Sequence, residues 1–297
     1  MLTVLGNFCS RIFPARSNFI RHLIGVLLFP FCICAYAAGP WTGPIFDAHL
    51  HYNDDAVTEY SIGMVIELFS KNGVKAVLAN SRPNDGSRAL HDAIERVKRK
   101  DVVRAVPFIR VYRDRSDYGT WFANPEIYAM IESEFERGIY RGIGEFHVFG
   151  KDAGGEWVKK IVNFAVENNL LLYAHCDEEA LETLFSHNPK ARIIWAHTGF
   201  TTPLPKVEEY LKKYPALWGE LSYRWDVSDN GKINPEWRAL FVKYPSRFLV
   251  GSDTWVNQRW QSYPEIMGLY RRWLGELPAE VAAQIAWGNG ARLFGVE

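Results

Sequence analysis

Short apolar or β-rich segments recur along the chain at regular intervals. Several are apolar at successive residues, as in VKAVLA and RIIWA. Continuous apolar runs of this length are typical of parallel strands covered on both faces. Eight segments are therefore predicted to be strands: Ile45–His51, Val74–Asn80, Val102–Val111, Tyr140–Phe149, Leu170–Cys176, Ala191–His197, Ala216–Tyr223 and Arg247–Asp253.

The segments between these strands have the periodicity of helices. Ile127, Met130, Ile131 and Phe135 form one apolar stripe, and Pro125 marks the start of that helix. Eight strands that alternate with helices predict an α/β fold, a single-domain (β/α)8 TIM barrel. A doubly wound open sheet is the alternative, but no Gly-x-Gly-x-x-Gly motif follows the first strand.

The beginning of the chain has a different pattern. Residues 1–46 contain no Asp or Glu, and three arginines precede an uncharged apolar run over residues 23–38. That run is shorter than the roughly 20 residues that span a bilayer, and residues 35–37 (AYA) have the small-x-small form of a signal-peptidase site. We expect residues 1–37 to be a signal peptide and residues 38–297 to be the barrel. A buried helix and a retained membrane anchor are the alternatives.

Cleavage after residue 37 would change the composition of the protein. The 34 basic and 34 acidic groups of the whole chain would become 31 and 34, a net charge of about −3 over 260 residues. Cys176 would be the only remaining cysteine of four, which excludes an internal disulfide and favours a buried, inert thiol. We expect an exported protein, periplasmic or secreted, without a stable membrane anchor after cleavage.

The charge also bears on partners. A slightly acidic chain without a basic run does not favour nucleic acid as a partner, because phosphate contacts need clustered Lys and Arg. A small-molecule substrate is the expected partner, and the sequence leaves the formation of a homo-oligomer open.

Chemistry-bearing residues lie at the ends of the predicted strands. His49 and His51 end the first strand, and side chains two residues apart in a strand point to the same side. Four more candidates follow at intervals of 96, 30, 22 and 56 residues, which are whole numbers of strand–helix units. Barrel active sites lie at the carboxyl ends of the strands, and imidazole with carboxylate suits Zn²⁺ or a similar divalent ion. The four further candidate ligands are Glu145, His175, His197 and Asp253.

These residues resemble the metal site of the amidohydrolase superfamily, beginning with the motif Asp47-Ala48-His49-Leu50-His51. Residues 285–295 (IAWGNGARLFG) also resemble the closing helix of its amidohydrolase-related (amidohydrolase 2) branch. The resemblance covers essentially all of residues 38–297 and implies a metal-dependent hydrolase with one or two ions. It implies that His49, His51 and Asp253 hold a first ion, that His175 and His197 hold a second, and that Glu145 bridges them.

The same resemblance implies a mechanism. Asp253 would accept a proton from the attacking water and pass it to the leaving group. In a one-metal version, His197 would instead polarise the substrate carbonyl, while the other histidines and Asp253 bind the ion. We expect hydrolysis of an amide, ester or lactone bond. A metal-dependent phosphoesterase or deoxyribonuclease, a one-metal decarboxylase and a non-catalytic binding protein are the alternatives.

Further residues are candidates for substrate binding. His147 follows Glu145 by two residues and is placed either to contact substrate or ligands, or simply to pack. Arg110 and Arg224 are predicted to bind an anionic substrate, because guanidinium groups match the geometry of carboxylates. Arg82, Arg113 and Arg259 also lie in or near loops that follow predicted strands. Four tryptophans lie in similar loops and are candidates to line an apolar pocket: Trp121, Trp225, Trp255 and Trp260.

Overall fold

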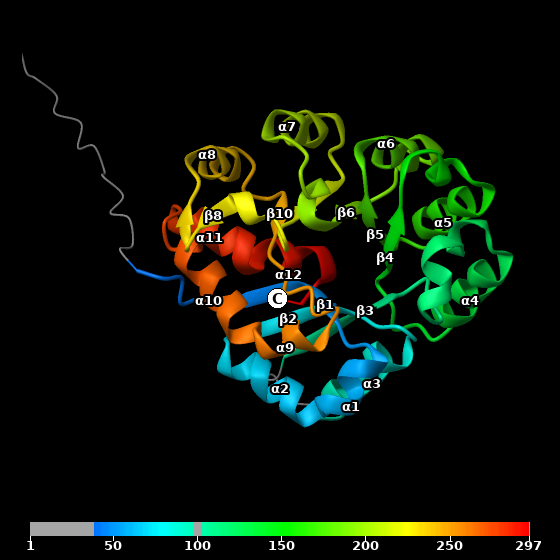
Figure 1. Cartoon of the computed structure of the whole chain (residues 1–297), viewed down its shortest axis with the longest axis horizontal. Helices are drawn as coiled ribbons and strands as arrows, with labels where there is room; N and C mark the ends of the chain where they lie inside the picture. Colours follow the sequence, from blue (N-terminus) through cyan, green and yellow to red (C-terminus); the bar gives the residue numbers. More distant parts are fainter. Residues whose placement is uncertain (1–38, 98–102, 297) are drawn as a thin grey trace, which may run out of the picture. The chain divides into compact units, whose positions relative to one another are not determined.

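The described part of the chain is a nearly closed barrel of parallel strands with helices around its outside (Figure 1). The structure is a computed structural model that describes residues 39–97 and 103–296, so the predicted signal peptide lies outside the described residues. The barrel strands follow one another in chain order, and each pairs in parallel with the next. They are β1 (Ile45–His51), β2 (Val74–Asn80), β3 (Arg104–Ile109), β4 (Gly142–Val148), β5 (Leu171–Cys176), β6 (Ile193–Trp195), β7 (Leu217–Glu220) and β10 (Phe248–Leu249).

The last strand returns to the first, which brings the two ends of the sheet together. The backbone N–H of Ala48 donates to the carbonyl of Val250 at 2.8 Å, and that of Asp253 donates to the carbonyl of His49 at 2.6 Å. The predicted α/β barrel is therefore confirmed in its eight parallel strands. Strands β1 and β2 have the predicted bounds, whereas β6 ends at Trp195, before the predicted end.

The helices begin where the sequence offers caps. Asn124 and Asn234 accept hydrogen bonds from the backbone N–H groups of Glu126 and Glu236, each beside a proline in the first turn. In the part of the chain that the structure describes, the α-helices are α1 (Asp54–Glu59), α2 (Ile62–Lys71), α3 (Asp85–Val97), α4 (Pro125–Phe135), α5 (Glu156–Glu167), α6 (Glu178–His187), α7 (Leu204–Lys213), α8 (Pro235–Lys243), α9 (Asn257–Gln261), α10 (Tyr263–Leu274), α11 (Ala279–Ala283) and α12 (Asn289–Phe294).

Shorter elements complete the described chain. The antiparallel strands β8 (Ser228–Asp229) and β9 (Lys232–Ile233) form a small hairpin outside the barrel. Short helical turns lie in several loops: η1 (Arg115–Gly119), η2 (Trp121–Ala123), η3 (Gly150–Gly154), η4 (Ala196–Gly199) and η5 (Trp225–Val227). A π-helical turn, η6 (Gln284–Gly288), joins α11 to α12. Of these, η1 and η4 contribute to the candidate site.

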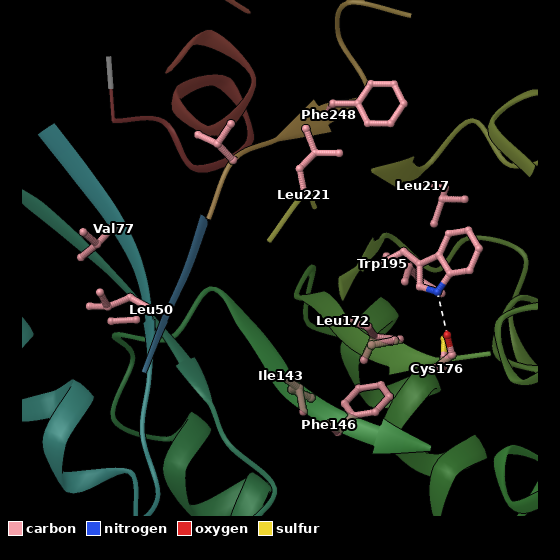
Figure 2. Close-up of a cluster of buried hydrophobic side chains, with 14 of the residues drawn as sticks. Leu50, Val77, Ile143, Phe146, Leu172, Cys176, Trp195, Leu217, Leu221 and Phe248 are labelled. Carbon is pink, nitrogen blue, oxygen red and sulfur yellow. Dashed lines mark hydrogen bonds between the residues drawn. The ribbon is translucent and has the colours of Figure 1, made fainter. Parts of the chain in front are cut away.

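The barrel separates two apolar cores. The larger lies between the strands and the surrounding helices, and Figure 2 shows part of it, including Trp195 with its indole N–H donated to the carbonyl of Cys176. Cys176 is buried, as predicted, and burial raises the pKa of its thiol. The smaller core, here called the apolar plug, fills the barrel interior. It consists of Phe46, Ala48, Ala76, Leu78, Val106, Phe108, Leu171, Tyr173, Ile194, Ala196 and Leu249.

The end of the chain covers the apolar plug. Phe294 of α12 stacks on Phe46 with ring centroids 5.6 Å apart, and Trp287 lies 6.3 Å from the same ring. The plug thus occupies the interior below the level at which the polar side chains begin. Among the described residues, no helix has the length and apolar character needed to cross a membrane.

Candidate metal centre

An irregularity in β1 turns two histidines into the barrel. The register of β1 against β2 shifts between Asp47 and Leu50, so the strand carries one extra residue there. Ala48 accordingly faces the apolar plug, whereas Leu50, two residues later, faces the outer core. His49 and His51 both point inward beyond the shift, with their Nε2 atoms 3.0 Å apart. The expectation that they present their rings together is met.

Glu145 reaches the same point from β4, where the register against β5 also shifts, between Gly144 and Phe146. A glycine is needed before it, because Gly144 has a φ of +124° and a Cβ there would come within 2.3 Å of the carbonyl oxygen of Tyr173. The sequence predicted Glu145 at the end of its strand. In the structure it lies within β4, three residues before the strand ends at Val148.

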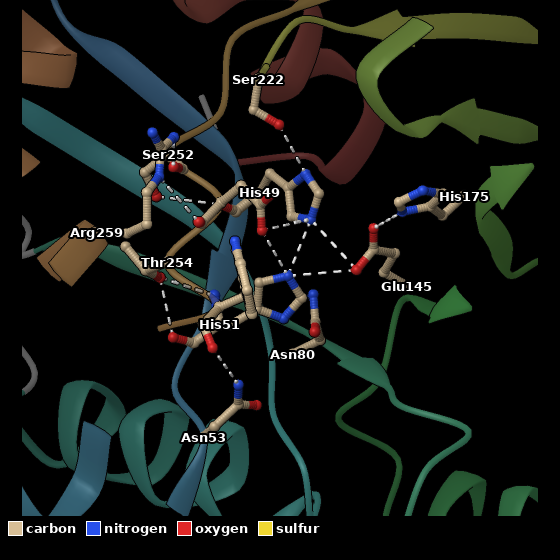
Figure 3. A network of polar contacts seen from close by, with 12 residues as sticks. His49, His51, Asn53, Asn80, Glu145, His175, Ser222, Ser252, Thr254 and Arg259 are labelled. Carbon is tan, nitrogen blue, oxygen red and sulfur yellow. Dashed lines mark hydrogen bonds and ion pairs between the residues drawn. The ribbon is translucent and has the colours of Figure 1, made fainter. Parts of the chain in front are cut away.

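The first group of ligand atoms has the spacing of a metal site (Figure 3). Nε2 of His49 lies 3.4 Å from Oδ1 of Asp253 and 3.6 Å from Oε2 of Glu145. Nε2 of His51 lies 3.0 Å and 3.3 Å from the same two oxygens. Ligand atoms about 2.1 Å from a tetrahedral ion are about 3.4 Å apart. These four side chains fit a divalent cation in donor type and in spacing.

The second group of ligand atoms surrounds the other oxygen of Glu145. Oε1 lies 3.0 Å from Nδ1 of His175 and 3.6 Å from Nε2 of His197. Figure 3 shows Glu145 between His175 on one side and the pair His49 and His51 on the other. One carboxylate therefore joins two sets of nitrogen donors through its two separate oxygens.

Buried acceptors fix two of the histidine rings as ligands. Nδ1 of His49 lies 3.0 Å from Oε2 of Glu220, and Nδ1 of His197 lies 3.0 Å from the carbonyl oxygen of Ser222. Because both acceptors need a proton, each Nδ1 carries hydrogen, and in the neutral ring each Nε2 then has the lone pair that binds a metal ion. Nδ1 of His51 instead faces the guanidinium of Arg110, which can only donate, so no acceptor holds hydrogen on that nitrogen.

Electrostatics at the centre favour a cation. Despite burial, the carboxylates of Asp253, Glu145 and Glu220 raise the pKa of His49 well above its usual value. Burial opposes ionisation of Asp253, yet the charge of His49 and a hydrogen bond from His51 hold its pKa below the usual range. Burial lowers the pKa of His175, which keeps the ring neutral, as a ligand must be.

A cavity of about 350 Å³ opens onto the two groups of ligands. Its floor holds the carboxylates of Glu145 and Asp253, with the rings of His175 and His197. A volume of this size suits a small molecule. The remaining lining residues are mainly aromatic or basic: Arg110, Tyr118, His147, Phe200, Tyr223 and Trp255.

The structure brings most of the predicted site residues together. All six predicted ligands converge, and Arg110 and His147 line the cavity. Arg224 is not among the lining residues. Its guanidinium is buried over the ring of Trp237, with hydrogen bonds to Asp226 and to the carbonyl oxygens of Thr198 and Thr202.

Of the tryptophans expected to wall a pocket, only Trp255 lines this cavity. Trp121 and Trp260 are buried in the outer core, so the expectation is wrong for them. Trp225 is exposed and lies edge-on to Tyr223, which does line the cavity.

Three residues that contact the candidate site residues are absent from the sequence-based prediction. Glu220 is fully buried behind His49, and it ends β7. The rule that barrel sites lie at strand ends would have found it. Tyr112 and Tyr118 follow β3 and contact His147, with ring centroids 5.9 and 5.3 Å from its ring. No sequence signal distinguishes these two from the other tyrosines.

Comparison with known sequences agrees with this geometry. The Amidohydrolase family model matches residues 47–296, which is most of the chain. The chain belongs to the amidohydrolase family. It is therefore an enzyme, and a divalent metal is the cofactor of this family. A search of curated proteins finds no match.

Solved structures share the fold at low sequence identity. A Pseudomonas putida protein assigned as a 2-pyrone-4,6-dicarboxylic acid hydrolase is 16% identical, with a TM-score of 0.56 over 85% of this chain and 98% of its own. A zinc-bound amidohydrolase from Burkholderia multivorans is 17% identical, with a TM-score of 0.53 over 86% and 100%. A 2,6-dihydroxybenzoate decarboxylase is 12% identical, with a TM-score of 0.53 over 85% of this chain and 99% of its own.

Proposed function

We propose that this amidohydrolase-family enzyme is an exported hydrolase that uses two zinc ions to cleave an amide, ester or lactone bond of a small, anionic substrate. The observation that carries the proposal is the position of Glu145. Its two oxygens face two separate groups of nitrogen donors, at 3.0 to 3.6 Å. Nitrogen and carboxylate donors in such groups suit zinc.

The residues have distinct roles in this proposal. His49, His51 and Asp253 would hold one ion, His175 and His197 the other, and Glu145 both. When bound, a divalent cation polarises the substrate oxygen and lowers the pKa of water to about 7, so that hydroxide is available at neutral pH. The chain's own groups orient the substrate and move the protons.

Asp253 is the proposed proton carrier. Its carboxylate lines the cavity, and its lowered pKa keeps it ionised at neutral pH. An ionised carboxylate at the cavity floor accepts the proton of the attacking water and returns it to the leaving group. Its backbone N–H is held by the carbonyl of His49, which fixes the carboxylate beside the ligands.

The tautomer of His197 favours the two-metal arrangement over the one-metal alternative. Polarisation of a substrate carbonyl by His197 would need a proton on Nε2. That nitrogen instead has a lone pair if the ring is neutral, because Nδ1 donates to the carbonyl of Ser222. The neutral ring of His197 is thus suited to bind an ion. Despite burial, the hydrogen bond to Glu145 raises the pKa of this ring, and a bound cation would favour the neutral form.

Metal analysis combined with a substrate panel tests the proposal. The purified protein is measured for bound metal, stripped with a chelator and reloaded with Zn²⁺. It is then assayed with lactones, esters, amides, phosphodiesters and aromatic carboxylic acids. We expect two zinc ions per chain, and turnover of a lactone, ester or amide that disappears on stripping and returns on reloading.

Other results would redirect the assignment. Release of CO₂ by a protein with one ion would identify a decarboxylase, and turnover of phosphodiesters alone would identify a phosphoesterase. Separate fractionation of cells that express the whole chain tests export: loss of residues 1–37 and appearance outside the cytoplasm are expected. Full-length protein retained in the cytoplasm would contradict that part of the proposal.

A further inference from the structure

One part of the cavity wall is built from hydrogen-bond donors. Tyr118 of η1 and His147 of β4 both line the cavity, and their ring centroids are 5.3 Å apart. Behind them, Tyr112 stacks on Tyr118 with centroids 4.1 Å apart and is itself fully buried. These side chains pack against one another, and the ring of His147 also lies 4.1 Å from that of His175.

Tyr112 fixes which nitrogen of His147 carries hydrogen. The hydroxyl of Tyr112 accepts the backbone N–H of His147 at 2.6 Å and lies 2.8 Å from its Nδ1. Among the described residues, Nδ1 is the one acceptor within reach of this buried hydroxyl, so the O–H donates to Nδ1. The neutral ring of His147 then carries its hydrogen on Nε2, the nitrogen that the tyrosine leaves free for the cavity.

The hydroxyl of Tyr118 is oriented by a different pair of contacts. Its oxygen accepts hydrogen bonds from Nη1 of Arg82 at 2.9 Å and from Nη2 of Arg110 at 3.4 Å. A guanidinium has no acceptor, so the hydrogen of Tyr118 is directed to neither arginine. It remains free to donate to a molecule in the cavity.

Two guanidinium groups lie behind the hydroxyl of Tyr118, each of them also near a carboxylate. Arg82 and Arg110 both reach the hydroxyl of Tyr118, and both guanidiniums are buried. Arg110 also lies 3.3 Å from Glu145, whereas Arg82 lies 3.4 Å from Asp55, outside the cavity lining. Donors without acceptors, backed by two cations, match a group that offers only acceptor oxygens and negative charge.

We propose that Tyr118 and His147 form a carboxylate-binding subsite, with Tyr112, Arg82 and Arg110 as positioning residues. The subsite would hold the carboxylate of the substrate next to the metal centre. It rests on the proposed function only in sharing the same cavity. The subsite recognises a carboxylate through two neutral hydrogen-bond donors and the nearby guanidinium groups. Arg224 is not part of it.

Calorimetric titration with two probes tests the subsite directly. Benzoate and benzamide have the same shape, but only benzoate offers two anionic acceptor oxygens. We expect the zinc-loaded protein to bind benzoate more tightly than benzamide. Tyr118→Phe and His147→Leu should each weaken benzoate binding about tenfold or more, because each removes a hydrogen bond to a charged group. His147→Gln, which retains an N–H donor, should recover part of the affinity.

Two further measurements separate this role from a merely structural one. Tyr128→Phe, on α4 and away from the cavity lining, should leave benzoate binding unchanged. The ¹⁵N shifts of His147 should show hydrogen on Nε2 in the wild-type protein, and a larger share on Nδ1 in Tyr112→Phe.

The proposal is overturned if benzoate does not bind, or binds Tyr118→Phe and His147→Leu as tightly as the wild-type protein at equal zinc content. The second result would mean that the carboxylate sits on the metal alone. Hydrogen on Nδ1 of His147 in the wild-type protein would also overturn it. Benzoate binding that depends on Tyr118, in a protein that hydrolyses no substrate of the panel, would remove the proposed function and keep the subsite.

Discussion

The two ends of the barrel interior use burial in opposite ways. In the apolar plug, Phe46 and Phe108 contact Phe294 from the closing helix, and every contact adds to stability because apolar surface leaves water. At the metal centre, His49 and Glu145 are equally buried, yet burying polar or charged groups costs free energy unless partners compensate. The same strands thus contribute stabilising apolar side chains at one end of the barrel interior and candidate metal ligands at the other.

Backbone conformation follows the same division. Seven described residues other than glycine have positive φ, and two of them are asparagines, which tolerate it. The other five are at or beside the site: His197, Thr198, Phe200, Tyr223 and Asp253. Unfavourable backbone at a functional site persists only where the surrounding structure holds it. The contrast indicates that burial of the apolar plug offsets the cost of the buried polar groups and the unfavourable backbone at the metal centre.

Replacement of Asp253 by Asn should have the largest effect on activity. Loss of the proton carrier is expected to lower kcat by about 10²- to 10⁴-fold, provided that the metal content is retained. Steady-state kinetics and metal analysis of the same preparation check this.

Asp229→Asn, in the exposed hairpin, is the matched control and should behave as wild type. Unchanged kcat in Asp253→Asn with full metal content would remove Asp253 from the mechanism.

Replacement of Phe46 by Ala should produce the reverse pattern. Truncation of a buried phenylalanine costs about 3–5 kcal/mol of unfolding free energy, because a cavity is left beside Phe294 and Trp287. Denaturant unfolding measures that loss, while kcat of the folded protein should stay close to wild type. Met64→Ala, at an exposed position, is the control. A large loss of kcat at full folding would show that the two ends of the barrel are not separable.

The sequence predicted the outline of both regions because each depends on a local pattern. The apolar runs located the eight strands, and the strand ends brought all six candidate ligands together. Local patterns do not predict the direction in which the side chains of a loop point. Arg224 follows a strand as Arg110 does, but Asp226 two residues later pairs with its guanidinium and it stays out of the cavity lining.

The register shifts are the second feature that no sequence pattern gave. Alternation along an unbroken strand would place Ala48 and Leu50 on one face, and the extra residue in β1 places them on opposite faces. The carboxylate-binding subsite of Tyr118 and His147 likewise depends on Tyr112, which packs behind them. Packing of this kind is a property of the whole fold.

Replacement of Glu220 by Gln probes the boundary between the two regions, with a smaller effect. Glu220 accepts hydrogen bonds from Nδ1 of His49, from the backbone N–H of His197, and from both the N–H and the hydroxyl of Ser222. A glutamine would turn an NH₂ group toward some of these donors. Loss of such a partner typically weakens metal affinity 10- to 100-fold. Competition with a chelator measures it, and the exposed Glu236→Gln serves as control. Equal zinc affinity in Glu220→Gln would show that His49 is positioned without it.

The smallest effect is expected outside both regions, at Glu208 on α7. Hydrogen bonds from Lys243, Lys212 and Tyr244 lower the pKa of this partly exposed carboxyl from 4.5 to about 2. A lowered pKa means that its contribution to stability is present above about pH 4.5 and disappears as the pH falls toward 2. Because solvent screens exposed ion pairs, Glu208→Gln should melt almost as the wild type does at pH 7, and any difference should vanish at low pH. Thermal melts of both proteins across this range check the prediction. A marked loss of stability in Glu208→Gln at neutral pH would show that the outer ion pairs, and not the apolar plug alone, hold the barrel around its metal centre.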